Sequence, residues 1–197
     1  MRRAFEHCGA TVFLTDSPQQ IEKAGLLVLP GVGAFGDGMK ELDRRNLIGP
    51  IQKHAAAGHP FLGICLGMQM LMSLSEEFGV NEGLGLIQGK VMAIPNKGED
   101  GVQHKIPHIG WNRLMAPAEP DIWKKTILSE TAPGQSVYFV HSFMAEPVEK
   151  SARLADCDYN GIRVSAVIQK ENVYGCQFHP EKSGEAGLKM LSAFCRL

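Results

Sequence analysis

Short apolar runs alternate with helical patterns over the first 75 residues of the chain. The strand-like runs are uncharged and mostly apolar, and they lie at residues 11–15, 26–29 and 60–65. Segments with helical spacing or capping signals lie around them, at residues 1–8, 18–24, 39–46, 50–57 and 66–74. This alternation predicts an α/β fold with a largely parallel central sheet flanked by helices.

The second half of the chain is dominated by strand patterns. They occupy residues 84–94, 106–114, 136–144, 152–159, 162–169 and 173–178. The pair Asn160-Gly161 predicts a two-residue hairpin turn. A last helix from about Glu185 carries an apolar face made of Leu188, Leu191 and Phe194. No repeat or linker interrupts the pattern, so residues 1–197 are expected to form a single domain.

Composition narrows the class of protein. Lysine and arginine number 20 against 21 aspartates and glutamates, and no run of five like charges occurs. This balance disfavours nucleic acid or an anionic membrane as a partner. No apolar run approaches the ~18 residues that a membrane span needs, and the first residues lack the apolar core of a signal peptide. We therefore expect a cytoplasmic enzyme or binding protein.

The cysteines and histidines predict no metal site. Five cysteines are scattered without a C-x-x-C pair, which disfavours both a disulfide framework and zinc. No H-E-x-x-H or comparable spacing appears among the histidines. His108 and His141 end or interrupt apolar strands, where hydrogen-bonded core roles are the commoner use of histidine. Neither a metal nor another cofactor is expected.

Cys65 lies between Gly63 and Gly67, where the strand at 60–65 passes into a helical pattern. Gly-x-Cys-x-Gly is the cysteine counterpart of the nucleophile elbow, whose glycines leave room for a sharp strand–helix turn. The unpaired N–H groups at the start of the helix favour a thiolate. A lone free cysteine is more often buried and inert, but the two glycines favour a nucleophile that needs a nearby base.

The candidate base is His179, two residues before Glu181. Residues i and i+2 of an extended segment point to the same side, and Pro180 biases His179 away from helix. The Glu181 carboxylate can then hold Nδ1–H and leave Nε2 facing a thiol, which completes a nucleophile, base and orienting group. A His-x-Glu pair alone is usually a surface coincidence; its place at a strand end beside a cysteine elbow makes it informative.

A glycine-rich loop at residues 30–38 follows the strand at 26–29. It has neither the Gly-Lys-Ser/Thr of a phosphate-binding loop nor the spacing of a dinucleotide-binding fingerprint. Ligands of open α/β sheets gather beyond the carboxyl ends of the strands. The loop is therefore expected to lie beside Cys65.

Three motifs together resemble the class I, triad-type glutamine amidotransferases: LPGVG at 29–33, GICLGMQ at 63–69 and QFHPE at 177–181. PHIGWN at 107–112 and YFVHS at 138–142 make the chain similar to the glutaminase subunits of imidazole glycerol phosphate synthases, enzymes of histidine biosynthesis. The resemblance covers nearly the whole chain. It implies a flavodoxin-like amidotransferase fold, here expected to lack the family's first, interior strand and so to leave open ladder groups on the neighbouring strand.

The resemblance implies a role for each motif. Cys65 would attack the side-chain amide of glutamine, His179 would carry the proton to departing ammonia, and Glu181 would orient the imidazole. The backbone N–H of Leu66 and one from the Val32–Gly33 loop would meet the oxyanion. Water would then hydrolyse the thioester to glutamate.

The same resemblance implies substrate contacts and a partner. Gln69 matches a substrate-contact glutamine, and Glu77 corresponds to a carboxylate near the substrate ammonium, with Glu76 as a competitor. The substrate carboxylate would be held by backbone at His141, Ser142 and Phe143. Ammonia would pass through a channel to a (β/α)8-barrel cyclase in a heterodimer with low activity in the free glutaminase. The candidates for the shared face are Phe35, His108 and Trp111, the last of which could equally be a core residue.

Other interpretations stay open on the sequence alone. A glutaminase that serves another synthase, or a γ-glutamyl hydrolase, would use the same fold and triad. A non-catalytic binding subunit of this fold is a different class. The complete set of Cys65, His179 and Glu181 argues against it, whereas the missing first strand argues for it.

Overall fold

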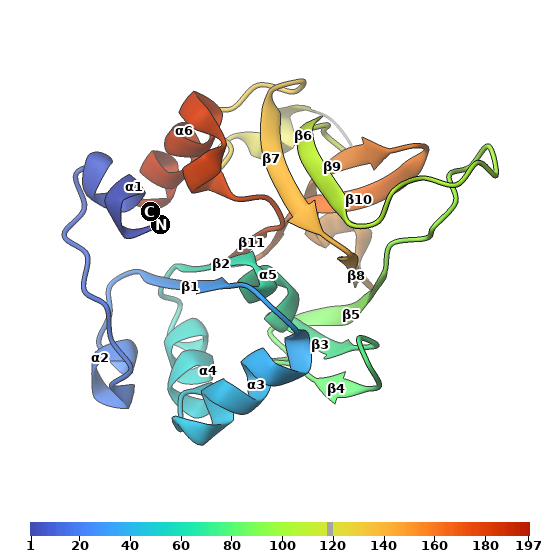
Figure 1. Ribbon diagram of the computed structural model, residues 1–197. Helices are drawn as coiled ribbons and strands as arrows, with labels where there is room; N and C mark the ends of the chain where they lie inside the picture. Colours follow the sequence, from blue (N-terminus) through green and yellow to red (C-terminus); the bar gives the residue numbers. More distant parts are fainter. Residues whose placement is uncertain (118–119) are drawn as a thin grey trace.

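A five-stranded sheet in the order β1-β2-β11-β10-β9 lies at the centre of the structure, a computed structural model that describes residues 1–117 and 120–197 (Figure 1). The strands are β1 (Leu27–Gly31), β2 (Phe61–Cys65), β9 (Arg153–Tyr159), β10 (Ile162–Lys170) and β11 (Val173–Cys176). β2 pairs in parallel with both β1 and β11, whereas β10 is antiparallel to β9 and β11. The α/β class is confirmed, but the central sheet is mixed rather than largely parallel, because the pairings of β2 are parallel and those of β10 are antiparallel.

Two smaller sheets extend one side of the molecule. A four-stranded sheet has the order β4-β3-β5-β8, made of β3 (Met72–Ser75), β4 (Asn81–Glu82), β5 (Ile87–Ala93) and β8 (Phe143–Pro147). An antiparallel ribbon joins β6 (His108–Arg113) to β7 (Ser136–His141). The run predicted as one strand at 136–144 is therefore divided at Ser142, because its two halves pair with different partners.

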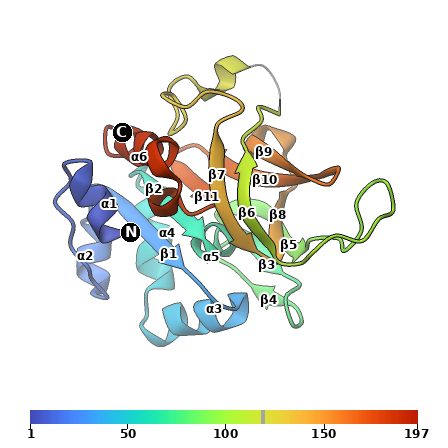
Figure 2. The same ribbon diagram turned by 45° about the horizontal axis from the view of Figure 1, so that its top comes forward.

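Helices cover both faces of the central sheet (Figures 1 and 2). On one face lie α1 (Arg2–His7) and α6 (Gly184–Phe194); on the other lie α2 (Pro18–Glu22), α3 (Phe35–Arg44) and α4 (Ile48–Ala56). The short α5 (Leu66–Met70) follows β2, and the 3-10 turns are η1 (Pro120–Trp123), η2 (Lys150–Ala152) and η3 (Pro180–Lys182). Among the described residues, no helix is long and apolar enough to cross a membrane.

β2 is the centre of the core, since all five of its residues are buried. Leu62 and Ile64 belong to the apolar cluster that includes Phe194 of α6, and Phe61 belongs to the cluster that includes Ile51 of α4. The alternation of side chains along a strand thus gives each face of β2 its own apolar layer. A strand buried on both faces reads as the continuous apolar run seen in the sequence.

Two further sequence predictions of local structure were wrong. Residues 11–15 form no strand, and Phe13 and Leu14 are 82% and 77% exposed; β1 is an edge strand paired only with β2, and no described strand reaches this segment. The helix predicted over 66–74 ends at Met70, because Met72–Ser75 pair with β5. Tertiary pairing has overridden the helical propensity of leucine and methionine. The turn predicted at Asn160-Gly161 is confirmed, with φ of 53° and 86°.

The glycines around Cys65 are required by close backbone contacts. A Cβ on Gly67 would overlap the carbonyl oxygen of Leu29 in β1, and one on Gly63 would lie 2.5 Å from the carbonyl oxygen of Gly67. Strand, turn and helix can approach this closely only where neither residue has a side chain. The predicted use of both glycines in a tight elbow is confirmed.

We predict that Gly67→Ala lowers the free energy of unfolding by about 1–3 kcal/mol, because the added methyl group forces β1 and α5 apart. Gly49→Ala is the matched control: it lies in α4 with nothing within 4 Å of its added Cβ, and should stabilise by up to about 1 kcal/mol. Urea unfolding followed by circular dichroism measures both. Equal stability of the two variants would contradict the close approach.

Candidate active site

Cys65 occupies a strained backbone position at the junction of β2 and α5. Its φ and ψ are 55° and −112°, a conformation that residues with a Cβ seldom adopt. Such strain costs about 1–3 kcal/mol and persists where the surroundings dictate it; here the buried β2 and the two glycines do so. The register pairs Cys65 with Gly31, so the glycine-rich loop begins beside Cys65, as expected.

His179 reaches the same edge of the sheet because β11 runs parallel to β2, with Cys176 opposite Ile64. The segment after β11 is held by β7: His179 N–H donates to the Tyr138 carbonyl (2.9 Å). The Ser183 hydroxyl accepts the Tyr138 N–H (3.0 Å) and donates to the His179 carbonyl (2.7 Å). Ser183 was missed in the sequence, since only the fold shows that β7 lies beside this turn.

The imidazole of His179 lies between a carboxylate and a sulfur. Its Nδ1 is 3.0 Å from Oε1 of Glu181, and its buried Nε2 forms no hydrogen bond within the described residues, either to Cys65 or to another group. Interaction with the Cys65 sulfur, and next with Glu181, raises the pKa of His179 to about 9 against the opposing effect of burial. Burial opposes ionisation of Glu181, but the hydrogen bond from His179 holds the pKa of that carboxyl below its ordinary value. At neutral pH the ring is therefore an imidazolium.

Two glutamine amides connect this group to β8. Gln69 Nε2 donates both to the Phe143 carbonyl (3.1 Å) and to Gln177 Oε1 (3.0 Å). The Gln177 amide is thereby oriented with Nε2 toward the Cys65 sulfur, at 3.8 Å. Gln177 was given no role from the sequence, although the i, i+2 rule that joined His179 to Glu181 also places Gln177 on the same side as His179.

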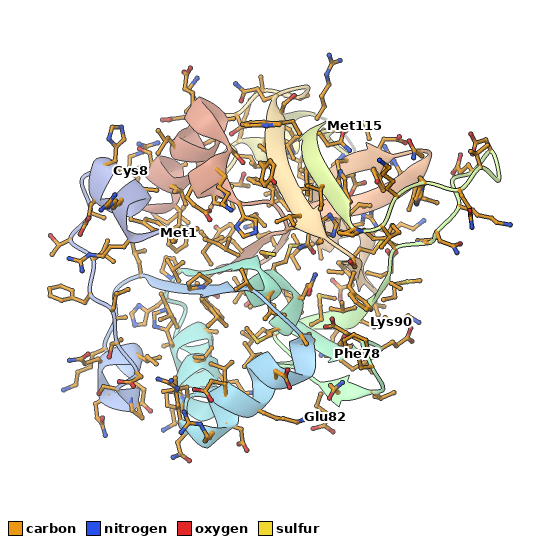
Figure 3. All side chains as sticks on the ribbon, in the orientation of Figure 1. Met1, Cys8, Phe78, Glu82, Lys90 and Met115 are labelled. Atoms are coloured by element: carbon orange, nitrogen blue, oxygen red, sulfur yellow. The ribbon has the colours of Figure 1, made fainter. Side chains whose placement is uncertain are left out.

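Of the two adjacent glutamates, the structure turns Glu77 inward. Its Oε2 accepts the backbone N–H of Phe35 at the start of α3 (2.7 Å), and its own N–H donates to Ser75 Oγ (3.1 Å). Glu76 instead forms an exposed ion pair with Lys90 (2.7 Å). Phe78 follows on the β3–β4 connection (Figure 3), with its ring centroid 6.4 Å from that of Phe143. The residue after Glu77 thus contacts Phe143.

The remaining predicted site residues lie on three segments, which are the start of α5, the loop after β1 and the end of β7. Leu66 is buried, and a Cβ on Gly31 would lie only 3.0 Å from its Cβ. Val32 is 79% exposed and Gly33 has a φ of 100°, so this loop is a turn open to solvent. His141 is buried, and the Ser142 carbonyl accepts the Ile94 N–H (2.9 Å) between β7 and β8.

Of the three residues predicted for a shared face, two are buried and one is exposed. Phe35 (0% exposed) and His108 (3% exposed) are core residues, so their assignment to a surface was wrong. Trp111 is 59% exposed, as is its neighbour on the same strand face, Ile109 (58%). Tyr138 lies opposite Trp111 in the register, with the Lys182 ammonium 5.9 Å from the centre of its ring.

The arrangement suits nucleophilic chemistry at sulfur. A thiol on a strained turn, an imidazolium beside it and a carboxylate behind the ring are the parts of a covalent catalytic centre. No group of three or more His, Cys, Asp or Glu side chains able to hold a metal ion occurs within the described residues.

Comparisons with known proteins agree with one another. Residues 1–196 match the sequence model of the family "Glutamine amidotransferase class-I". The chain is 56% identical over 195 residues to imidazole glycerol phosphate synthase subunit HisH 1 of Legionella pneumophila (strain Lens), which covers 99% of this chain and 92% of the relative. It is 42% identical to subunit HisH of Bacillus subtilis (strain 168), with coverage of 99% and 89%.

A solved structure, described as a crystal structure of glutamine amidotransferase, has a TM-score of 0.71 at 15% identity, covers 98% of this chain and 92% of its own, and supports the fold. The chain therefore belongs to the class-I glutamine amidotransferases and, within them, to the family of imidazole glycerol phosphate synthase subunits HisH.

Proposed function

We propose that the chain is the glutaminase subunit of an imidazole glycerol phosphate synthase, working in the cytoplasm in histidine biosynthesis. It hydrolyses glutamine to glutamate and supplies the ammonia to a (β/α)8-barrel cyclase. That partner makes imidazole glycerol phosphate and aminoimidazole carboxamide ribotide. The observation that carries the proposal is the convergence of Cys65, His179 and Glu181 at the carboxyl ends of β2 and β11.

The reaction begins with the sulfur of Cys65. Next to His179, it attacks the side-chain amide carbon of glutamine as a thiolate, the nucleophilic form of cysteine, and forms a tetrahedral oxyanion. The Leu66 N–H, which follows the nucleophile, and an N–H of the Val32–Gly33 loop are the proposed donors to that oxyanion. One such donor is typically worth about 2.7–4 kcal/mol of transition-state stabilisation.

His179 then gives its proton to the departing nitrogen, and the C–N bond breaks. Ammonia departs, and a γ-glutamyl thioester remains on Cys65. In the second half, neutral His179 takes a proton from water as the oxygen attacks the thioester. Glutamate leaves, and the thiolate and imidazolium are restored. Glu181 keeps the Nε2 side of the ring aimed at the reacting atoms throughout, because its carboxylate holds Nδ1–H.

The substrate contacts follow from the surrounding donors and acceptors. Gln69 uses both amide hydrogens within the protein, so its Oε1 is the atom available to a substrate. The Glu77 carboxylate, fixed by the Phe35 N–H, supplies the negative charge for the substrate ammonium. The backbone at His141, Ser142 and Phe143 receives the substrate carboxylate.

The proposed face for the cyclase is the exposed side of β6 and β7. Ile109 and Trp111 are two residues apart and therefore lie on the same side of β6. Tyr138 and Lys182 continue this surface toward the His179 turn. Aromatic side chains supported in this way are frequent anchors of protein interfaces. The surface borders the triad through Tyr138, whose backbone is bonded to His179.

The nucleophile is tested by substitution. Cys65→Ala should lower glutamate release from glutamine, in the presence of the cyclase, by at least roughly 10³-fold, because no covalent intermediate can form. Cys8→Ala, at a half-exposed cysteine of α1's end, is the matched control and should leave the rate unchanged. Equal glutamate release by the two variants would exclude the proposed chemistry.

The pH profile tests the ion pair. Because His179 acts as an imidazolium with a pKa of about 9, kcat/KM for glutamine should fall as pH rises through about 9. The raised pKa of His179 also stabilises the fold. This contribution to the free energy of unfolding is complete below pH 6.5 and is lost as the pH rises through about 9. Glu181→Gln removes one of the groups that raise the pKa of His179, so the decline of kcat/KM at alkaline pH should move to lower pH. An alkaline limb that stays in place in this variant would contradict the pairing.

The partner surface is tested by Trp111→Ala, which should raise the Kd for the cyclase about 10–100-fold, as expected for a tryptophan anchor that becomes buried in the complex. Val148→Ala, 75% exposed after β8, is the control and should leave the affinity unchanged. Isothermal titration calorimetry measures both. Wild-type affinity in Trp111→Ala would show that the cyclase binds elsewhere.

A further inference from the structure

A pair of buried histidines with no part in the triad lies on the β6–β7 ribbon. His108 and His141 are directly opposite in the register and are 3% and 6% exposed. Nδ1 of His108 is 3.0 Å from Nε2 of His141. Two imidazoles in contact inside a protein need a defined arrangement of protons, because one nitrogen must donate and the other must accept.

The neighbours of the pair settle that arrangement. His141 Nδ1 lies 2.8 Å from the Phe143 carbonyl, which can only accept, so Nδ1 of His141 carries the proton. Its Nε2 must then accept, and His108 Nδ1 donates to it. Nε2 of His108 is left as an acceptor, 3.4 Å from the Asn112 amide nitrogen. All the hydrogen bonds therefore run one way, from Asn112 through both rings to Phe143.

Packing fixes the rings in place. His108 is stacked between Phe139 and Tyr159, with ring centroids 4.8 and 4.1 Å away. Burial lowers the pKa of both histidines to about 4, so both are neutral at physiological pH. Asn112 is anchored in turn, since its amide also donates to the Asp158 carbonyl (2.6 Å) and its oxygen accepts the Arg113 N–H (2.7 Å).

The chain of hydrogen bonds ends on the backbone proposed to bind substrate. Phe143 pairs with Ala93 of β5, and the Ile94 N–H donates to the Ser142 carbonyl. This is a pair whose own N–H and C=O point away from the neighbouring strand. The Phe143 carbonyl accordingly meets His141 and Gln69, and the Phe143 N–H is directed to that same side.

We propose that His108 is a positioning residue: through His141, its Nδ1–H holds Phe143 in the orientation that presents the Phe143 N–H to the α-carboxylate of the substrate. The proposal rests on the proposed glutaminase function. His108 touches neither glutamine nor the reacting atoms. Its effect is on binding of the substrate, because the sulfur and His179 are positioned by β2 and β11 instead.

The test compares three variants assayed for glutamate release with the cyclase present. His108→Phe keeps an aromatic ring between Phe139 and Tyr159 but removes the donor, and should raise the KM for glutamine about tenfold, the equivalent of one lost hydrogen bond, with kcat within about twofold. His108→Asn restores a donor near the Nδ1 position and should recover most of the wild-type KM. Tyr159→Phe keeps the stacking, loses only the bond to the Lys105 carbonyl, and should leave KM unchanged.

A second measurement needs no activity. In ¹⁵N-labelled protein, ring-nitrogen NMR should find both His108 and His141 protonated at Nδ1, and an Nε2–H form of either ring would overturn the proposal. A folded His108→Phe variant with unchanged KM would also overturn it. If the wild-type chain released no glutamate with the cyclase, that result would instead contradict the proposed function. The NMR measurement would still show which nitrogens of His108 and His141 carry protons.

Discussion

The parallel pairing of β2 with β1 and β11 is the constraint on which the rest of the site depends. It brings the carboxyl ends of three strands to one edge, and therefore places the glycine-rich loop, the cysteine turn and the His179 turn side by side. The close approach of Gly67 to the Leu29 carbonyl fixes how sharply β2 can pass into α5. Because β2 is buried along its whole length, this edge is held by the core of the protein.

The surroundings of each buried histidine determine its protonation state. His179 is charged at neutral pH because a sulfur and a carboxylate flank it, whereas His108 and His141 are neutral because burial is the dominant effect on both. Imidazoles in one region thus serve opposite purposes. The charged ring exchanges protons in the proposed reaction, and the neutral rings hold backbone in place through fixed hydrogen bonds.

The features of the fold and site that the sequence predicts are those with local signals. The elbow followed from two glycines around Cys65, the pairing of His179 with Glu181 from an i, i+2 spacing beside a proline, and the hairpin from Asn160-Gly161. Gln177 was within reach of the same spacing rule and was overlooked.

The parts that sequence could not predict depend on distant partners. Residues 72–75 read as helix and form β3 because β5 lies beside them. The run at 136–144 reads as one strand, yet Ser142 divides it between two sheets. The sequence predicts a hydrogen-bonded core role for His108 and also makes it a candidate for the shared face, and the contacts with His141 and Tyr159 confirm the core role.

The central claim is that Cys65 forms a covalent bond with substrate during turnover. Rapid acid quenching of the protein while it hydrolyses glutamine with the cyclase, followed by peptide mass spectrometry, tests it most directly. A γ-glutamyl group is expected on the peptide that contains Cys65 and on no other cysteine peptide. Full turnover without that adduct, or an adduct on a different cysteine such as Cys176, would contradict it.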